Sequence, residues 1–140
     1  MTTAAVTTTP ARGFDSLTDE VRLDRLSVQG TVPGWLTGSL VRTGPALWDL
    51  PEQTMKHWFD GLAMLHRFSF ADQNVSYANR FLETRAYRAA RERGRLSYSE
   101  FATDPCRSLF QRVTAMFSPS LTDNANVNLV RLGERFVAMT

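Results

Sequence analysis

Two stretches of the chain alternate apolar and polar side chains with the period of a half-buried β-strand. In residues 63–70 one face carries Met64, His66, Phe68 and Phe70, and in residues 75–82 one face carries Val75, Tyr77, Asn79 and Phe81. The residues between them, Ala-Asp-Gln-Asn at 71–74, form a short polar connection. The pattern therefore predicts an antiparallel hairpin.

Other short strands are predicted on either side of this hairpin. A second hairpin is predicted at residues 127–132 and 135–139, because Gly133 and Glu134 separate two apolar runs. Nearer the amino terminus, residues 26–29 and 39–42 are predicted to be brief strands. Turns are expected at Gly30, at Val-Pro-Gly 32–34 and at Thr-Gly-Pro 43–45.

Two segments between the predicted strands have helical patterns. Residues 83–93 contain three alanines and stop at Gly94, a typical residue after a helix. Residues 104–117 begin with Asp104 and Pro105, which suit the N-cap and the first helical position. This second segment carries one apolar stripe, made of Cys106, Leu109, Phe110, Val113, Met116 and Phe117. The predicted class is all-β with small helical insertions, as in β-propeller blades or part of a sandwich.

The two ends of the chain differ in character. Residues 1–13 are rich in threonine and alanine and are expected to be a disordered tail, because they offer little to bury. Residues 14–140 are expected to be ordered. The last predicted strand is apolar and has no polar tail, so we expect a truncated chain that is the amino-terminal part of a larger domain.

Composition limits the class of protein. The chain of 140 residues is 43% hydrophobic and 21% charged, which is typical of a globular protein. The first ten residues do not have the pattern of a secretory signal, and the sequence has no long apolar run, so a cytoplasmic location is expected. The net charge of +2 is too small for a typical nucleic-acid-binding protein, and no such partner is expected. Five arginines in one stretch predict a solvated helix face; they are Arg85, Arg88, Arg91, Arg93 and Arg95.

Four stretches match the motifs of a known family in order and at about its spacing. They are Val32-Pro-Gly-Trp-Leu-Thr-Gly-Ser-Leu-Val-Arg-Thr-Gly-Pro45, His57-Trp-Phe-Asp-Gly-Leu-Ala-Met-Leu-His-Arg-Phe68, Val75-Ser-Tyr-Ala-Asn-Arg-Phe-Leu-Glu-Thr-Arg-Ala-Tyr87 and Thr122-Asp-Asn-Ala-Asn-Val-Asn128. Together they resemble the carotenoid cleavage oxygenases. Residues 98–101 and 104–106 resemble the branch that contains animal β-carotene oxygenases and the retinoid isomerohydrolase. Structural roles are expected for the motif residues Arg42, Gly44, Pro45, Phe59, Asp60, Gly61 and Asn124.

The resemblance implies both a fold and a chemistry. The fold is a seven-bladed β-propeller, of which this chain holds the first blades. Family members bind Fe(II) through four histidines and use O₂ to cleave a double bond of a carotenoid or apocarotenoid. All four ligands are expected downstream of Thr140, so this chain alone is expected to hold no catalytic or metal-binding residue, to bind no iron and to be inactive. Two alternatives remain open: a non-catalytic β module that binds membrane surfaces, and the same fold acting as a retinoid isomerase or a stilbene-cleaving enzyme.

A few residues invite a functional interpretation that must be weighed against a structural one. His57 and His66 lack a third ligand, and a satisfied histidine at the core or its rim is favoured. Asp60-Gly61 is favoured as a turn in which Asp bonds to backbone and Gly supplies a positive φ. Arg42 is expected to be buried and paired. The stripe of 104–117 is about equally suited to membrane docking and to core packing.

Overall fold

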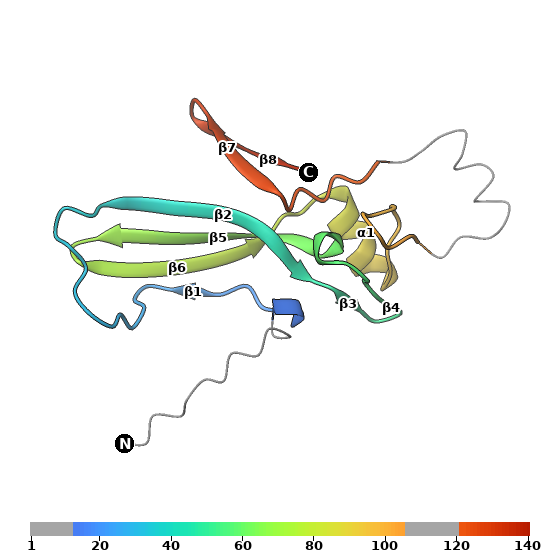
Figure 1. Cartoon of the computed structure of the whole chain (residues 1–140), viewed down its shortest axis with the longest axis horizontal. Coiled ribbons are helices and arrows are strands. Elements are labelled where there is room, and N and C mark those ends of the chain that lie inside the picture. Colours follow the sequence, from blue (N-terminus) through green and yellow to red (C-terminus); the bar gives the residue numbers. More distant parts are fainter. Residues whose placement is uncertain (1–12, 106–120) are drawn as a thin grey trace, which may run out of the picture.

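The computed structural model describes residues 13–105 and 121–140. This part of the chain is mostly β-sheet and carries one α-helix, α1 (Arg85–Arg93), together with a short 3₁₀ turn, η2 (Trp58–Asp60). Figure 1 shows a long sheet with α1, β3 and β4 at one end. The strands are β1 (Arg22–Leu23), β2 (Gly38–Leu47), β3 (Asp49–Leu50), β4 (Gln53–Thr54), β5 (Leu62–Ala71), β6 (Asn74–Phe81), β7 (Asn128–Leu132) and β8 (Arg135–Met139).

The main sheet is antiparallel and four-stranded, in the order β1-β6-β5-β2. The predicted hairpin is confirmed as β5–β6, with Asp72 and Gln73 in the left-handed conformation that a two-residue hairpin turn requires. The expected shared face is confirmed too. Its cross-strand pairs are Met64 with Phe81, His66 with Asn79, Phe68 with Tyr77, and Phe70 with Val75.

The strand predicted at 39–42 is confirmed, but the turn expected at 43–45 and the strand expected at 26–29 are wrong. The strand expected at 39–42 extends through Thr-Gly-Pro 43–45 to Leu47, because β2 is an edge strand where a proline leaves no ladder bond unmade. No strand forms at 26–29; the sheet edge is taken instead by β1, which pairs with Tyr77 and Ala78. After β1, only the hydrogen bond from Leu26 N to Val75 O (2.7 Å) ties this segment to β6.

The helix at 83–93 and the second hairpin are confirmed as α1 and β7–β8. Thr84 caps α1 by accepting a hydrogen bond from Tyr87 N, and Gly94 ends it at φ 67°. The five arginines of this region are exposed, as expected of a solvated face. The helix predicted at 104–117, with its stripe from Cys106 to Phe117, lies outside the described residues from 106 onward, as do residues 1–12 of the predicted tail.

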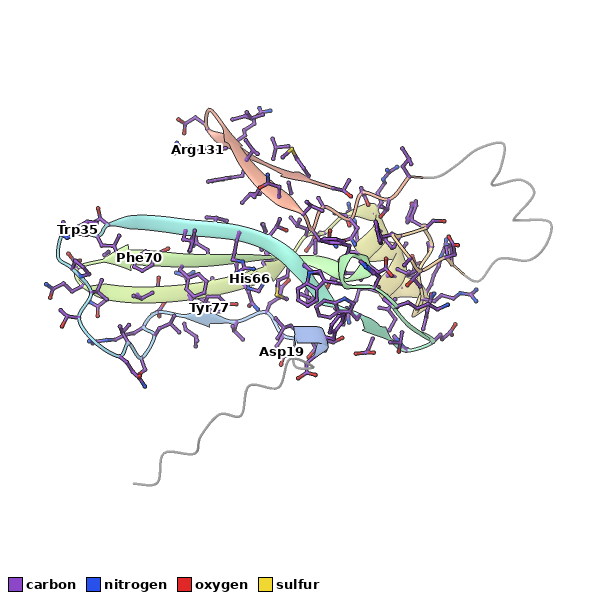
Figure 2. All side chains as sticks on the ribbon, viewed as in Figure 1. Asp19, Trp35, His66, Phe70, Tyr77 and Arg131 are labelled. Carbon is purple, nitrogen blue, oxygen red and sulfur yellow. The ribbon has the colours of Figure 1, made fainter. Side chains whose placement is uncertain are left out.

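The hydrophobic core lies at the α1 end of the sheet. Its buried members are Ala46, Leu47, Trp48, Leu50, Met55, Leu62, Met64, Phe81, Ala90 and Leu96. The opposite tip of the sheet is much less covered: Trp35 is 80% exposed and Leu40 is 55% exposed. Figure 2 shows Trp35 and Phe70 at this tip, with His66 and Tyr77 midway along the sheet. Burial therefore anchors the chain around β2, β5 and η2, where the motif residues also meet.

Candidate functional site

The turn that enters β5 is organised by a buried carboxylate. Asp60 is fully buried and accepts hydrogen bonds from His57 N (3.0 Å), Ala102 N (2.8 Å) and Thr103 Oγ1 (2.5 Å). His57 in turn accepts a hydrogen bond from Phe59 N through its Nδ1 atom (3.2 Å), which completes a capping box around η2. Asp60 therefore fixes backbone, as the structural interpretation predicted.

Gly61 is required for a different reason from the expected one. Its φ is −56°, so the predicted positive φ is wrong. A Cβ at this position would lie 2.7 Å from the indole ring of Trp48 and 2.8 Å from Cβ of Pro45. Trp48 is held in place by the hydrogen bond that its Nε1 donates to Trp58 O (3.1 Å). Glycine is thus needed because the chain passes directly against this indole.

Two asparagines of the motif at 122–128 form hydrogen bonds to the turn that enters β5. Asn124 is buried; its Oδ1 accepts from Ala63 N (2.9 Å), and its Nδ2 donates to Gly61 O (3.1 Å). Asn126 Nδ2 donates to Phe59 O (2.7 Å) and to Gly61 O (2.8 Å). We call Asp60, Gly61, Asn124 and Asn126 the clasp. It joins segments that are more than sixty positions apart.

Asp123, next to Asn124 in sequence, connects the clasp to α1. Asp123 caps α1 by accepting hydrogen bonds from Arg85 N (2.9 Å) and Ala86 N (2.9 Å), and it pairs with the Arg85 side chain (3.1 Å). Partial burial opposes ionisation of Asp123, but these hydrogen bonds prevail and lower its pKa. The pKa of Glu100 shifts in the opposite direction. Burial raises the pKa of Glu100 to about 7, although hydrogen bonds from Thr122 and Asn124 counteract this rise.

Neither histidine of the described chain is placed as a metal ligand. His66 is half-buried on the sheet face, and its Nδ1 lies 2.8 Å from the Tyr77 hydroxyl. Burial and the nearby Arg42 charge lower the pKa of His66, so its neutral form is favoured. Arg42 itself is exposed, and the expectation that it is buried and paired is wrong for the described structure. Arg42 lies on the edge strand β2 directly opposite His66, and its charge acts on His66 and Tyr77.

The described residues do not fit an iron centre. Within residues 13–105 and 121–140, no three His, Cys, Asp or Glu side chains are grouped so that they could hold a metal ion. Over the same residues, no helix is long and apolar enough to cross a membrane. The membrane-docking residues expected between Cys106 and Phe117 lie outside the described part.

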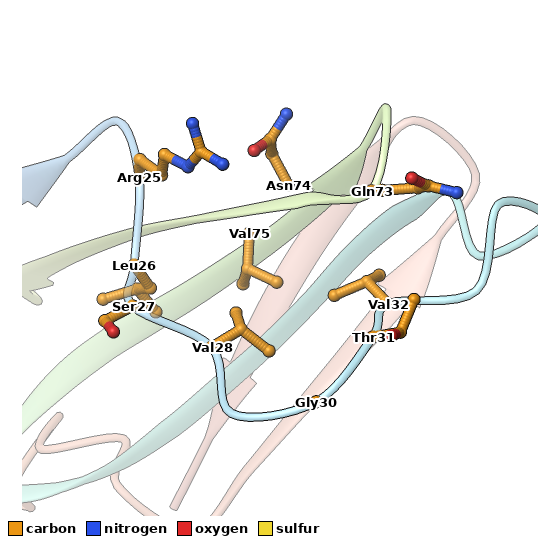
Figure 3. Close-up of a pocket in the computed structure, with 10 residues that line it drawn as sticks. All are labelled: Arg25, Leu26, Ser27, Val28, Gly30, Thr31, Val32, Gln73, Asn74 and Val75. Atoms are coloured by element: carbon orange, nitrogen blue, oxygen red, sulfur yellow. The ribbon is translucent and has the colours of Figure 1, made fainter.

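A surface hollow of about 370 Å³ lies between residues 25–32 and the start of β6 (Figure 3). Val28, Val32 and Val75 form its apolar side, and Arg25 supplies its single charged group. No carboxylate, histidine or cysteine lines it, so nothing there could carry acid–base or metal chemistry.

The sequence identified part of the clasp and missed the rest. Asp60, Gly61 and Asn124 were singled out as motif residues, and the structure brings them together with Pro45 packed against Gly61. Asn126, Thr122, Glu100 and Thr103 were not assigned roles. The first two lie in the motif at 122–128 and Glu100 lies in the branch-specific stretch 98–101, so the signal was present without any indication of the contacts.

Comparisons with known proteins agree on one family. The family model described as retinal pigment epithelial membrane protein (RPE65) matches residues 14–140. The chain is 40% identical to rat β,β-carotene 15,15'-dioxygenase over 123 residues, which is 83% of this chain and 22% of the relative. It is 41% identical to the human mitochondrial carotenoid-cleaving dioxygenase over 113 residues, covering 74% of this chain and 20% of that protein.

The fold matches solved structures as well. A single-residue mutant of Synechocystis apocarotenoid oxygenase superposes with a TM-score of 0.80 at 30% identity, over 91% of this chain and 26% of that one. A cobalt-substituted form of the same oxygenase gives a TM-score of 0.80 at 29% identity, with the same shares covered. The chain thus corresponds to part of that oxygenase fold, and spans about a fifth of the length of the curated relatives.

Proposed function

The chain belongs to the RPE65/carotenoid cleavage oxygenase family, and we propose that the protein carrying it uses Fe(II) and O₂ to cleave a double bond of a carotenoid or apocarotenoid. In this reaction the carbon–carbon double bond and the O–O bond break, and each carbon receives one oxygen atom as a carbonyl. The observation that carries the proposal is the 40% identity to a β-carotene dioxygenase over 83% of this chain.

In this proposal the described residues supply framework. The clasp fixes η2 and the entry into β5, and β5 and β6 form the centre of the sheet. We place this sheet in the first blades of a seven-bladed propeller. Trp35 and Leu40, at the tip of the sheet, are apolar and exposed, which suits packing against neighbouring blades.

The iron must be held by residues that the described structure does not contain. His57 Nδ1 accepts a backbone hydrogen bond and His66 Nδ1 lies against the Tyr77 hydroxyl, so neither histidine belongs to a ligand cluster. We propose four histidine ligands beyond Thr140, as the family resemblance implies. Fe(II) bound there would supply O₂ activation.

The test compares the full-length natural protein with the chain of residues 1–140. After reconstitution with Fe(II), the full-length protein should bind stoichiometric iron and convert β-carotene or an apocarotenal into carbonyl products that carry label from ¹⁸O₂. The isolated chain should do neither. Iron binding without any cleavage product would reject the oxygenase and favour the alternative of a retinoid isomerase. Stoichiometric iron on the isolated chain would reject the placement of the ligands.

We also propose that the protein acts in the cytoplasm, peripherally at a membrane that contains its lipid-soluble substrate. The residues expected to dock are those of the stripe between Cys106 and Phe117. Liposome co-sedimentation of the full-length protein, with and without the paired changes Phe110→Asp and Phe117→Asp, tests this. A folded double variant that still sediments like the wild type would contradict it.

A further inference from the structure

Glu100 lies where two segments that are distant in sequence meet. Its Oε1 accepts a hydrogen bond from Thr122 Oγ1 at 2.7 Å, and its Oε2 lies 3.4 Å from Asn124 Nδ2. The Thr122 hydroxyl also accepts from Asn124 N (3.1 Å), while Glu100 N donates to Thr103 O (3.0 Å). One carboxyl therefore joins residues 98–103 to residues 121–126 beside the clasp.

The charges around this carboxyl are mostly negative. Asp60 faces it from η2, and Asp123 faces it from the segment 121–126. Arg85 of α1 pairs with Asp123 and lies over the Tyr98 ring, so its charge is already engaged. Among the described residues, no arginine or lysine forms an ion pair with Glu100. An ionised Glu100 therefore places a further negative charge in a partly buried cluster that already holds Asp60.

We propose that Glu100 is a proton-controlled tie: its neutral carboxyl holds residues 98–103 and 121–126 together, and loss of the proton loosens them. The neutral group can still share a hydrogen bond with the Thr122 hydroxyl, because both can donate and accept. Separation of the two segments hydrates the carboxyl, and water stabilises its charged form. This device is independent of the proposed iron chemistry.

The sign of the pH effect follows from the direction of the shift. Burial raises the pKa of Glu100 from 4.5 to about 7 in the closed structure. Stabilisation of the closed form is complete below pH 4.5 and is lost as the pH rises through about 7. Because Glu100 is partly exposed, solvent screening makes the change in stability smaller than the full pKa shift implies. We expect local opening to become roughly tenfold more favourable between about pH 5.5 and about pH 8.

Hydrogen exchange in the full-length protein measures this opening. The reporters are the amides of Asn124 and Asn126, which donate hydrogen bonds to Thr122 Oγ1 and Asn124 O. After correction for intrinsic exchange rates, their protection in the wild type should fall roughly tenfold between about pH 5.5 and about pH 8. Glu100→Gln should abolish the pH dependence. The matched control Glu134→Gln, at an exposed glutamate in the β7–β8 turn, should leave it intact.

Two results would overturn the tie. One is equal protection of the Asn124 and Asn126 amides at both pH values in the wild-type protein; this test needs no variant. The other is a Glu100→Gln protein that keeps the wild-type pH dependence. If Glu100→Gln does not fold, Thr122→Val takes its place: it removes the hydroxyl that joins Glu100 to residues 121–126. Protection of the Asn126 amide, whose own hydrogen bond to Asn124 O this change leaves in place, should then be low at about pH 5.5 as well as at about pH 8. A Thr122→Val protein whose Asn126 protection and pH dependence match the wild type would equally refute the proposal.

Discussion

Replacing Asn124 by alanine should destabilise the protein more than any other single asparagine change near the clasp. The side chain is buried, and it serves both as acceptor for Ala63 N (2.9 Å) and as donor to Gly61 O (3.1 Å). Alanine can do neither, and water has little access because Asn124 and Ala63 are both about 2% exposed.

The magnitude can be worked from these contacts. A buried N–H left without its acceptor costs about 1–3 kcal/mol. The carbonyl of Gly61 suffers less, because Asn126 Nδ2 still donates to it at 2.8 Å. The lost side-chain volume adds about 1 kcal/mol. We therefore expect Asn124→Ala to lower the free energy of unfolding by about 2–4 kcal/mol, and Asn126→Ala to lower it by about 1–2 kcal/mol.

Urea unfolding of the full-length protein, followed by fluorescence, measures these differences. Asn128→Ala is the matched control, because Asn128 is exposed and lies only four positions away. Its effect should stay within about 0.5 kcal/mol. If Asn124→Ala and Asn128→Ala shifted the transition equally, the clasp would not hold the turn and the reasoning would be refuted.

Two further predictions concern the neighbouring motif residues. Gly61→Ala should lower the free energy of unfolding by about 3 kcal/mol, because its Cβ would collide with the Trp48 indole. Gly44→Ala is the control and should cost much less, because its Cβ would meet nothing nearer than 4.0 Å. Equal effects of the two changes in a urea titration would contradict this prediction. Arg42→Gln should raise the pKa of His66 in an NMR titration while leaving it below 6.5, because burial is the larger cause of its lowering; an unchanged pKa would show that the arginine charge does not reach the ring.

The hairpins could be predicted because their signal is local. Period-two alternation in residues 63–70 and 75–82 specified both the strands and the face they share, and the structure pairs the two strands in register. The turn was less obvious, since Gln73 adopts a positive φ of 61° that is uncommon for a side chain of its kind. Local pattern therefore gave the elements and left the turn geometry open.

The prediction failed where glycine and proline were interpreted from their sequence neighbours alone. Gly44 and Pro45 normally indicate a turn, yet both lie inside β2, because a strand at a sheet edge pairs on one side only. Gly61 was explained by a positive φ that it does not have; the reason for glycine is the Trp48 ring, which lies thirteen positions earlier and packs on it through the fold. Neither fact can be read from the adjacent sequence.

The clasp explains why these motifs identify the family without revealing its chemistry. Three of the four matching stretches converge on the turn at 57–61: Pro45 lies against it from the first, Asp60 and Gly61 form it in the second, and Asn124 binds it from the fourth. Each of these residues meets a demand of packing or of backbone hydrogen bonding, and such demands hold for any substrate. The motifs are therefore requirements of one way of building the sheet. The clasp residues therefore say nothing about the choice of substrate.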